Sequence, residues 1–122
     1  YVVLHPHNKK VNLVVVSASD LGFPKGASLK QIYGRARRLN LGFCPWEVAA
    51  QLRLQYRNQP RKEMLFVAVS PQADSHEVWH LPLVVNEYND EYVRYGRDLV
   101  VWVGIGWEDG YWPGKSLFVF SQ

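Results

Sequence analysis

Apolar residues fall in short runs separated by polar and turn-forming residues, a pattern that predicts β-strands. The clearest run, Val11–Ser17, is β-branched and nearly continuous, so we expect a strand buried on both faces. It can pair with the apolar segment Tyr1–Leu4 as a hairpin. Later runs predict four more strands: Glu63–Ser70, Val78–Asn86, Leu99–Ile105 and Leu117–Phe120. Pro82, inside one of them, predicts an edge position or a bulge.

The pattern changes to a helical period over residues 28–40. Apolar residues then recur at helical spacing on one face: Leu29, Ile32, Tyr33, Ala36 and Leu39. Ser28 is a favourable N-cap residue. Gly34 costs about 1 kcal/mol in a helix interior, which predicts a close packing contact at this position. Asn40 and Gly42 tolerate positive φ, so they predict the end of the helix.

A second, shorter helix is predicted over residues 45–52. Cys44 leads into Pro45, which suits the first turn of a helix because its missing N–H has no partner there. Glu47 lies near the positive end of the helix dipole. Residues 51–57 alternate between polar and apolar, which fits a strand equally well. We therefore expect a short helix followed by an extended segment.

This order of elements predicts an α+β fold. We expect a single domain with a mostly antiparallel sheet packed against one main helix (28–40) and a short second helix (45–52). A partly open barrel is the alternative, whereas a parallel doubly wound sheet would need further helices between the later strands. A length of 122 residues suits one globular domain spanning 1–122.

The segment Leu41–Pro60 also carries a recognisable pattern. The segment opens with LGFCP, in which one residue separates the LG pair from the CP pair, and EV, QLRLQY and QP follow. This resembles a pattern in a family of small uncharacterised bacterial proteins with no assigned activity. The resemblance implies a bacterial origin and one small domain, and it brings no catalytic residue with it.

Composition is that of a folded protein, with 48% hydrophobic and 20% charged residues. There is no run of 18 apolar residues, so we expect a soluble protein without a membrane span. The single cysteine excludes an internal disulfide and slightly favours the cytoplasm, although export stays open. Since the chain begins at Tyr1 rather than Met, we expect a trimmed or processed piece.

Charge is divided unevenly along the chain. Residues 1–62 hold eleven Lys and Arg against two acids, a net charge of +9, whereas residues 63–122 hold three against nine, a net charge of −6. This division fits either a bipolar surface or two halves that attract each other within one fold.

The basic residues of the first half are candidates for contact with phosphates or with an acidic partner. The set comprises Lys25, Lys30, Arg35, Arg37, Arg38, Arg53, Arg57, Arg61 and Lys62. The six strongest candidates are Lys30, Arg35, Arg37, Arg38, Arg53 and Arg57. Helix-turn-helix binding is not favoured, because the second helix is short and begins with proline. A solvated helix face is the alternative interpretation.

Residues 76–80, HEVWH, match the zinc-binding H-E-x-x-H motif. That motif requires a helix, but Pro82 and the β-branched residues that follow predict a strand over Val78–Val85. On a strand His76 and His80 would stand about 13 Å apart, too far to share one ion. We therefore expect no joint metal site.

Two further candidates for chemistry are weaker. His5 and His7 flank a proline and fit exposed turn residues better than a metal site. The helix dipole beside Cys44 could lower the pKa of its thiol, but no histidine is near in sequence to act as a base. A small buried packing role is the favoured interpretation of Cys44.

The second half is rich in aromatic residues in predicted loops. Of these, Trp107, Tyr111 and Trp112 are candidates for a platform that binds a sugar or peptide. Packing inside the fold explains them equally well.

We therefore expect a small non-catalytic bacterial domain that acts as a protein-interaction module. Its partner would be another protein or another segment of a longer chain. The alternatives are a nucleic-acid-binding domain using the basic face of residues 25–62, and a domain that binds a ligand on its C-terminal aromatic loops. No catalytic residue, metal or cofactor is expected, since no phosphate-binding loop, nucleophile elbow or kinase motif is present.

Overall fold

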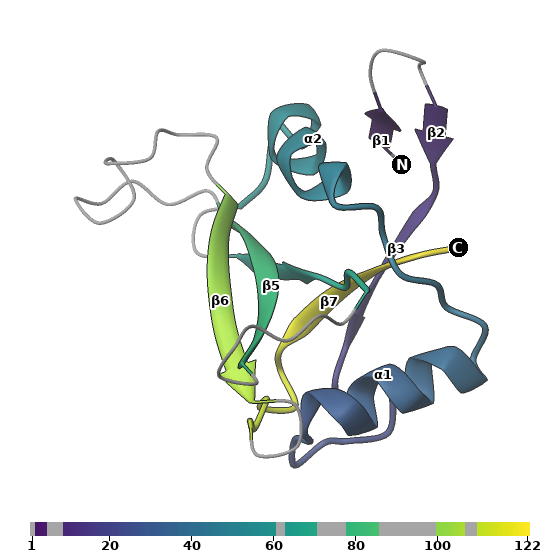
Figure 1. The fold of residues 1–122 in the computed structure, drawn as a ribbon, viewed down its shortest axis with the longest axis vertical. Coiled ribbons are helices and arrows are strands. Elements are labelled where there is room, and N and C mark those ends of the chain that lie inside the picture. Colours follow the sequence, from purple (N-terminus) through teal and green to yellow (C-terminus); the bar gives the residue numbers. More distant parts are fainter. Residues whose placement is uncertain (1, 5–8, 61–62, 71–77, 86–99, 107–109) are drawn as a thin grey trace.

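The structure is a computed structural model, and it describes residues 2–4, 9–60, 63–70, 78–85, 100–106 and 110–122. Within these ranges the elements, in chain order, are β1 (Val2–Leu4), β2 (Lys9–Val11), β3 (Leu13–Ser17), α1 (Leu29–Arg38), α2 (Glu47–Gln55), β4 (Met64–Val67), β5 (Val78–Val85), β6 (Val100–Gly106) and β7 (Leu117–Ser121). The predicted α+β class is confirmed (Figure 1).

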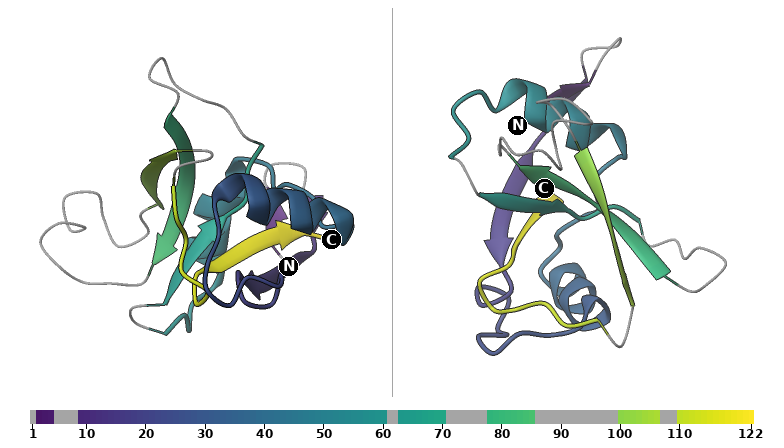
Figure 2. Two further views of the ribbon diagram at one scale, coloured as in Figure 1. Left: turned by 90° about the horizontal axis from the view of Figure 1, so that it is seen from below. Right: turned by 90° about the vertical axis from the view of Figure 1, so that its left-hand side faces the viewer.

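One mixed sheet dominates the fold, with strand order β3-β7-β4-β5-β6. All neighbouring strands are antiparallel except β4 and β7, which run parallel. The prediction of a mostly antiparallel sheet is therefore confirmed. Figure 2 shows how strongly the sheet twists between β3 and β6. The strands β1 and β2 form a separate antiparallel hairpin.

The first long strand differs from its prediction in two ways. The hairpin partner of β1 is β2, which includes only the first residue of the predicted run, Val11, whereas β3 pairs along its full length with β7. The predicted burial on both faces is also wrong, because Val15 is 49% exposed. Val14 and Val16 point to the other face and pack against the core, so β3 is covered on that face and open to solvent at Val15.

The sequence predicted an edge position or a bulge at Pro82, but neither is found, because the register of β5 with β6 is continuous from Val78 to Val84. Pro82 lies in β5, between β4 and β6, and is paired in register with Trp102 of β6. The ladder between β5 and β4 begins only at Leu83. Pro82 therefore has no ladder partner on its β4 side, and proline is compatible with a strand position that is not paired on both sides.

Both ends of α1 are fixed by local side-chain and backbone chemistry. Ser28 and Gln31 form a capping box, in which Gln31 N–H donates to Ser28 Oγ (3.2 Å) and Ser28 N–H donates to Gln31 Oε1 (3.0 Å). At the other end Asn40 adopts φ 61°, and the N–H of Leu41 reaches back to the carbonyl of Ala36. These are the bonds of a Schellman motif. The predictions for Ser28 and Asn40 are confirmed.

Gly42 has a different role from the one predicted. It is not at positive φ, so it does not supply the left-handed turn that ends α1. Instead it pairs as an antiparallel bridge with Ser121. An ideal Cβ at Gly42 would lie 2.7 Å from Ser121 Oγ, so the lack of a side chain permits this close approach.

The second helix continues beyond the predicted boundary, to Gln55, and the expected extended segment is wrong over residues 53–55. Val48, Ala49 and Arg53 are buried on one helical face. The Gln55 side chain is bonded to both backbone groups of Val3, with Oε1 accepting at 3.0 Å and Nε2 donating at 2.9 Å. These contacts with a distant strand favour the helix where the local pattern was ambiguous.

The buried apolar residues form a single cluster that joins sheet and helices. Phe118 of β7 is completely buried, and its ring lies 5.3 Å from Trp112 and 6.0 Å from Phe66 (centroid to centroid). The helix α1 packs on β7 through Tyr33, whose ring lies 6.1 Å from Phe120. The helix α2 instead contacts β1, β5 and β6. The two helices therefore lie at opposite ends of the molecule (Figures 1 and 2).

Candidate functional site

The exposed cations of the predicted basic set concentrate on α1. Four of them are exposed on this helix: Lys30, Arg35, Arg37 and Arg38. The apolar residues between them along the helix are buried and face the core. Three of them, Arg35, Arg37 and Arg38, occupy the last turn, where positive charge is favoured by the helix dipole. The amphipathic pattern of the sequence therefore places this part of the predicted basic set correctly.

Arg53 does not belong to a basic surface. It is 8% exposed, and its Nη1 donates to the carbonyl of Tyr56 (2.9 Å) and to Gln59 Oε1 (3.3 Å). Gln59 in turn donates to the carbonyls of Glu63 (3.1 Å) and Val84 (3.2 Å). The guanidinium thus joins the end of α2 to the sheet. Helical periodicity turns this side chain inward, a placement that an extended segment would not predict.

The remaining candidates do not form one face with α1. Arg57 is exposed but follows α2, at the other end of the molecule from α1. Lys25 is exposed just before α1, and Arg61 and Lys62 lie outside the described residues. The predicted basic face of residues 25–62 is therefore divided, and its coherent part is α1.

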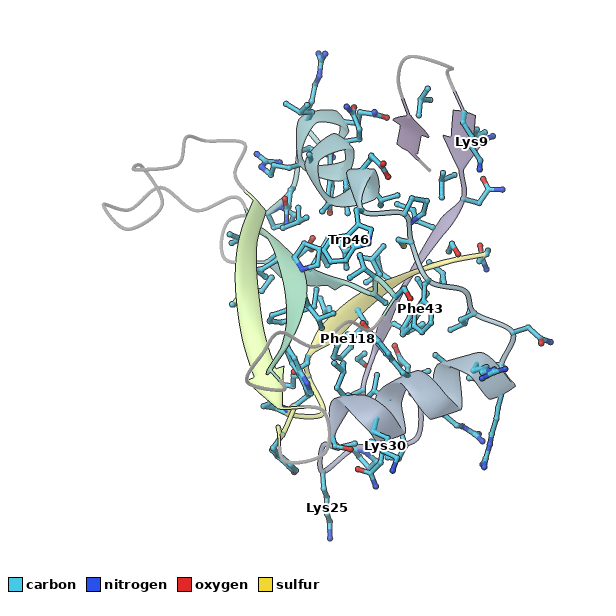
Figure 3. All side chains as sticks on the ribbon, viewed as in Figure 1. Lys9, Lys25, Lys30, Phe43, Trp46 and Phe118 are labelled. Atoms are coloured by element: carbon cyan, nitrogen blue, oxygen red, sulfur yellow. The ribbon has the colours of Figure 1, made fainter. Side chains whose placement is uncertain are left out.

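A groove runs along α1, between the helix and the chain that leaves it. We call it the α1 groove; it has a volume of about 600 Å³ and is lined by Lys30, Tyr33, Gly34, Ala36, Arg37, Leu41, Gly42, Phe43 and Phe120. Figure 3 shows Lys30 at the first turn of α1 and Phe43 above the same helix, beside β7. Of the described residues that line this groove, none is acidic.

The floor of the α1 groove is apolar and fixed. Tyr33, Ala36 and Phe120 are each at most 4% exposed, and the Tyr33 ring packs 5.0 Å from Phe43. The Tyr33 hydroxyl donates to the carbonyl of Val69 (3.2 Å). Burial is the main cause that raises the pKa of Tyr33 far above its usual value. Tyr33 is therefore a neutral floor residue that does not act as an acid or base near neutral pH.

The close packing contact predicted at Gly34 is wrong, because Gly34 faces the open space of the α1 groove. An ideal Cβ at this position would have no atom within 4 Å outside the helix itself. The opposite wall is Phe43, which is 44% exposed although its ring packs on Tyr33. A bare helix surface at Gly34 and an exposed aromatic wall together leave room for a side chain from another molecule.

Cys44 is a packing residue, as the favoured interpretation predicted. It is 3% exposed, its backbone N–H donates to the carbonyl of Ala68 (2.7 Å), and it precedes the N-cap Trp46 by two residues. Burial raises the pKa of the Cys44 thiol to about 12, so the alternative of a pKa lowered by the helix dipole is not found. A thiol in this state is a poor nucleophile at neutral pH.

The predicted aromatic platform is not built as expected. Trp112 is 5% exposed and packs on Phe66, with ring centroids 4.5 Å apart, so it belongs to the core. Tyr111 is 63% exposed, and Trp107 lies outside the described residues. Alternation along an extended segment explains this, because neighbouring residues point to opposite sides.

The histidine motifs are only partly within the described residues. The predicted strand over Val78–Val85 is confirmed, and it includes His80. His76, His5 and His7 lie outside the described residues. Over the described ranges, no group of three or more His, Cys, Asp or Glu side chains is placed to hold a metal ion. No helix within the same ranges is both long and apolar enough to cross a membrane.

Comparison of the chain with models of known protein families, with curated proteins and with solved structures found no match. The α1 groove must therefore be interpreted from its own geometry. Sequence reasoning identified its cations but missed its apolar part, which joins α1 to Phe43 and to the distant Phe120. The one local signal for it was the interior Gly34, which exposes helix backbone on the face that carries Lys30 and Arg37.

Proposed function

We propose that this protein is a small non-catalytic bacterial domain that binds another protein, and that the α1 groove holds an acidic segment of that partner. The observation that supports this most directly is the composition of the groove. Its floor and one wall are apolar, its rim carries Lys30 and Arg37, and no acidic residue is found among its described lining residues. Such a surface complements a segment that combines apolar and acidic side chains.

The spacing of Lys30 and Arg37 further restricts the sequence of the segment that the α1 groove can bind. Lys30 and Arg37 are seven positions apart in α1, which corresponds to about 10 Å along the helix axis. An extended chain covers that distance in about three residues. We therefore expect two acidic residues about three positions apart in the bound segment, with an apolar side chain between them lying over Gly34.

The wall of the groove supports a protein partner rather than a purely electrostatic one. Exposed apolar side chains recur along the connection from α1 to α2, with Leu39, Phe43 and Trp46 each between 41% and 48% exposed. Of these, Phe43 lines the α1 groove, and an exposed apolar group beside a charged rim is typical of protein interaction sites. Buried aromatic anchors also supply much of the affinity in such interfaces.

The test is a selection of random peptides displayed against the folded protein, followed by binding measurements on the selected peptides. We expect enrichment of two acidic residues flanking an aliphatic or aromatic residue. The double substitution Lys30→Glu with Arg37→Glu should weaken binding at least about tenfold, because both rim contacts become repulsive. Gly34→Trp should also abolish binding, since it fills the groove without meeting a neighbouring atom at its Cβ.

The matched control reverses two other charges on the same helix. Arg35 and Arg38 are exposed on α1 but do not line the groove. The pair Arg35→Glu with Arg38→Glu changes the net charge as much as the groove pair does, and it should leave peptide binding within about threefold. Equal loss in both pairs would contradict a specific groove. Stronger binding of DNA or RNA than of any peptide, lost in both pairs, would favour the nucleic-acid alternative.

A further inference from the structure

A second hollow lies away from the α1 groove, where the loop before α1 meets the segment before β7. We call it the Tyr111 hollow; it has a volume of about 780 Å³, and its polar lining residues are Ser17, Ser19, Lys25, Tyr111 and Lys115. Two prolines and Gly114 complete its described lining, which includes no acidic residue. A hollow of this size lies within the usual range for small-molecule sites.

Tyr111 is exposed but its position is closely defined. It is 63% exposed, and an ideal Cβ at Gly26 would lie 2.6 Å from both Cζ and Oη of the phenol. The ring therefore rests on bare backbone at Gly26. The two segments are joined there by an antiparallel bridge, in which Ala27 and Trp112 exchange N–H···O bonds of 3.0 and 2.8 Å. An exposed ring held on a bonded backbone is a suitable stacking surface.

The donors around this ring are suited to an anion. Lys25 and Lys115 are exposed and carry positive charge, and Figure 3 shows Lys25 projecting into solvent below α1. The Ser17 hydroxyl accepts from Asp20 N–H (2.9 Å) and the Asp20 carboxylate accepts from Ser17 N–H (2.9 Å), so the hydroxyl proton of Ser17 is not used in this turn. The Ser19 hydroxyl has no hydrogen-bond partner among the described residues, whereas its backbone N–H is bonded to Gly114. Two ammonium groups and two hydroxyls match the acceptors of a phosphate.

From this arrangement we infer that the Tyr111 hollow binds a small phosphorylated compound with a flat ring, of the chemical class of a nucleoside monophosphate. The ring stacks on Tyr111, and the phosphate receives hydrogen bonds from Lys25, Lys115 and the serine hydroxyls. This site shares no lining residue with the α1 groove, so the inference does not depend on the proposed protein partner.

The experiment is a titration of the isotope-labelled protein, followed by amide chemical shifts, with adenosine monophosphate, adenosine and inorganic phosphate as separate probes. We expect adenosine monophosphate to bind about tenfold or more tightly than either fragment, because only it engages both the ring and the cations. The largest shifts should fall at Ser19, Lys25 and Lys115. Similar affinities for all three probes, or shifts centred elsewhere, would overturn the inference.

Variants separate the two contributions. Tyr111→Ala should raise the Kd for adenosine monophosphate about tenfold, while Tyr111→Phe retains the stacking surface and should change it less than about threefold. Lys25→Gln with Lys115→Gln should raise it about tenfold or more and leave adenosine unaffected. The pair Arg35→Glu with Arg38→Glu, which lines neither the Tyr111 hollow nor the α1 groove, serves as the control and should change this Kd less than about threefold. No effect of Tyr111→Ala on a folded protein would refute the stacking role.

Discussion

Replacing three glycines by alanine, one at a time, tests how the backbone at each position contributes to stability. Gly34 lies in α1 with open space around an added Cβ. Gly22 has φ +97° and also has open space. Gly26 has φ +96°, and an added Cβ would lie 2.5 Å from the carbonyl oxygen of Trp112. An added methyl group therefore meets no obstacle at Gly34, conformational strain alone at Gly22, and strain together with a steric clash at Gly26.

The expected effects follow from these three environments. Gly34→Ala should raise the free energy of unfolding by about 0.5–1 kcal/mol, because alanine is the better helix former. Gly22→Ala should lower it by about 1–2 kcal/mol, the cost of an L-residue at that φ. Gly26→Ala should lower it by about 3 kcal/mol or more, since the clashing Trp112 oxygen also accepts the N–H of Ala27 (3.0 Å) and cannot move freely.

The assay is thermal unfolding followed by circular dichroism, with urea unfolding as a second measure. For 122 residues, 1 kcal/mol corresponds to about 4 °C in Tm. We therefore expect Gly34→Ala to gain about 2–4 °C, Gly22→Ala to lose about 4–8 °C and Gly26→Ala to lose about 12 °C or more. Equal losses at Gly22 and Gly26 would refute the close packing against Trp112, and a loss at Gly34 would refute the open surface of the α1 groove.

Three other substitutions test single interactions by the same unfolding measurements. Ser28→Ala should cost about 1 kcal/mol, because it removes the capping box of α1, whereas Ser28→Thr should keep most of it; equal effects would contradict the cap. Gln59→Ala should cost about 2–3 kcal/mol, since it removes one acceptor of Arg53 and the donors to two carbonyls; a loss below about 0.5 kcal/mol would refute this link. Cys44 ionises above about pH 8.5 in the unfolded chain but only near pH 12 when folded, so the unfolded state binds fewer protons and stability falls as pH rises between these values. From pH 8 to pH 10 this fall should be about 2 kcal/mol larger in the natural protein than in Cys44→Ala, and identical pH profiles would contradict the buried thiol.

The sequence by itself determined the elements whose signals are local. Ser28 and Asn40 defined both ends of α1, because capping and left-handed backbone depend on residues within a turn of each other. The apolar runs defined β5 and β7, and they correctly predicted a strand from Val78, which includes the described part of the match to the zinc-protease motif. Period and propensity were sufficient for these elements, and therefore for the α+β class.

Tertiary structure decided where each element and side chain was placed. The helix α2 continues to Gln55 because its last turn bonds to Val3 and buries Arg53, and both interactions involve partners that the local pattern does not indicate. Pro82 is tolerated inside the sheet because the ladder to β4 stops beside it.

The α1 groove could not be predicted from the sequence either, because it also depends on residues that are distant along the chain. A hydrophobic period shows which face of a helix is buried, but it does not show which distant residue covers that face or where the cover ends. Phe120 completes the floor from the last strand, and Phe43 stands as a wall beside the bare backbone of Gly34. The sequence alone predicted the cations of α1, because they lie on the polar side of an amphipathic helix. The α1 groove depends on the tertiary structure. Phe43 and Phe120 pack against α1 at Tyr33, whereas the helix surface at Gly34 stays uncovered.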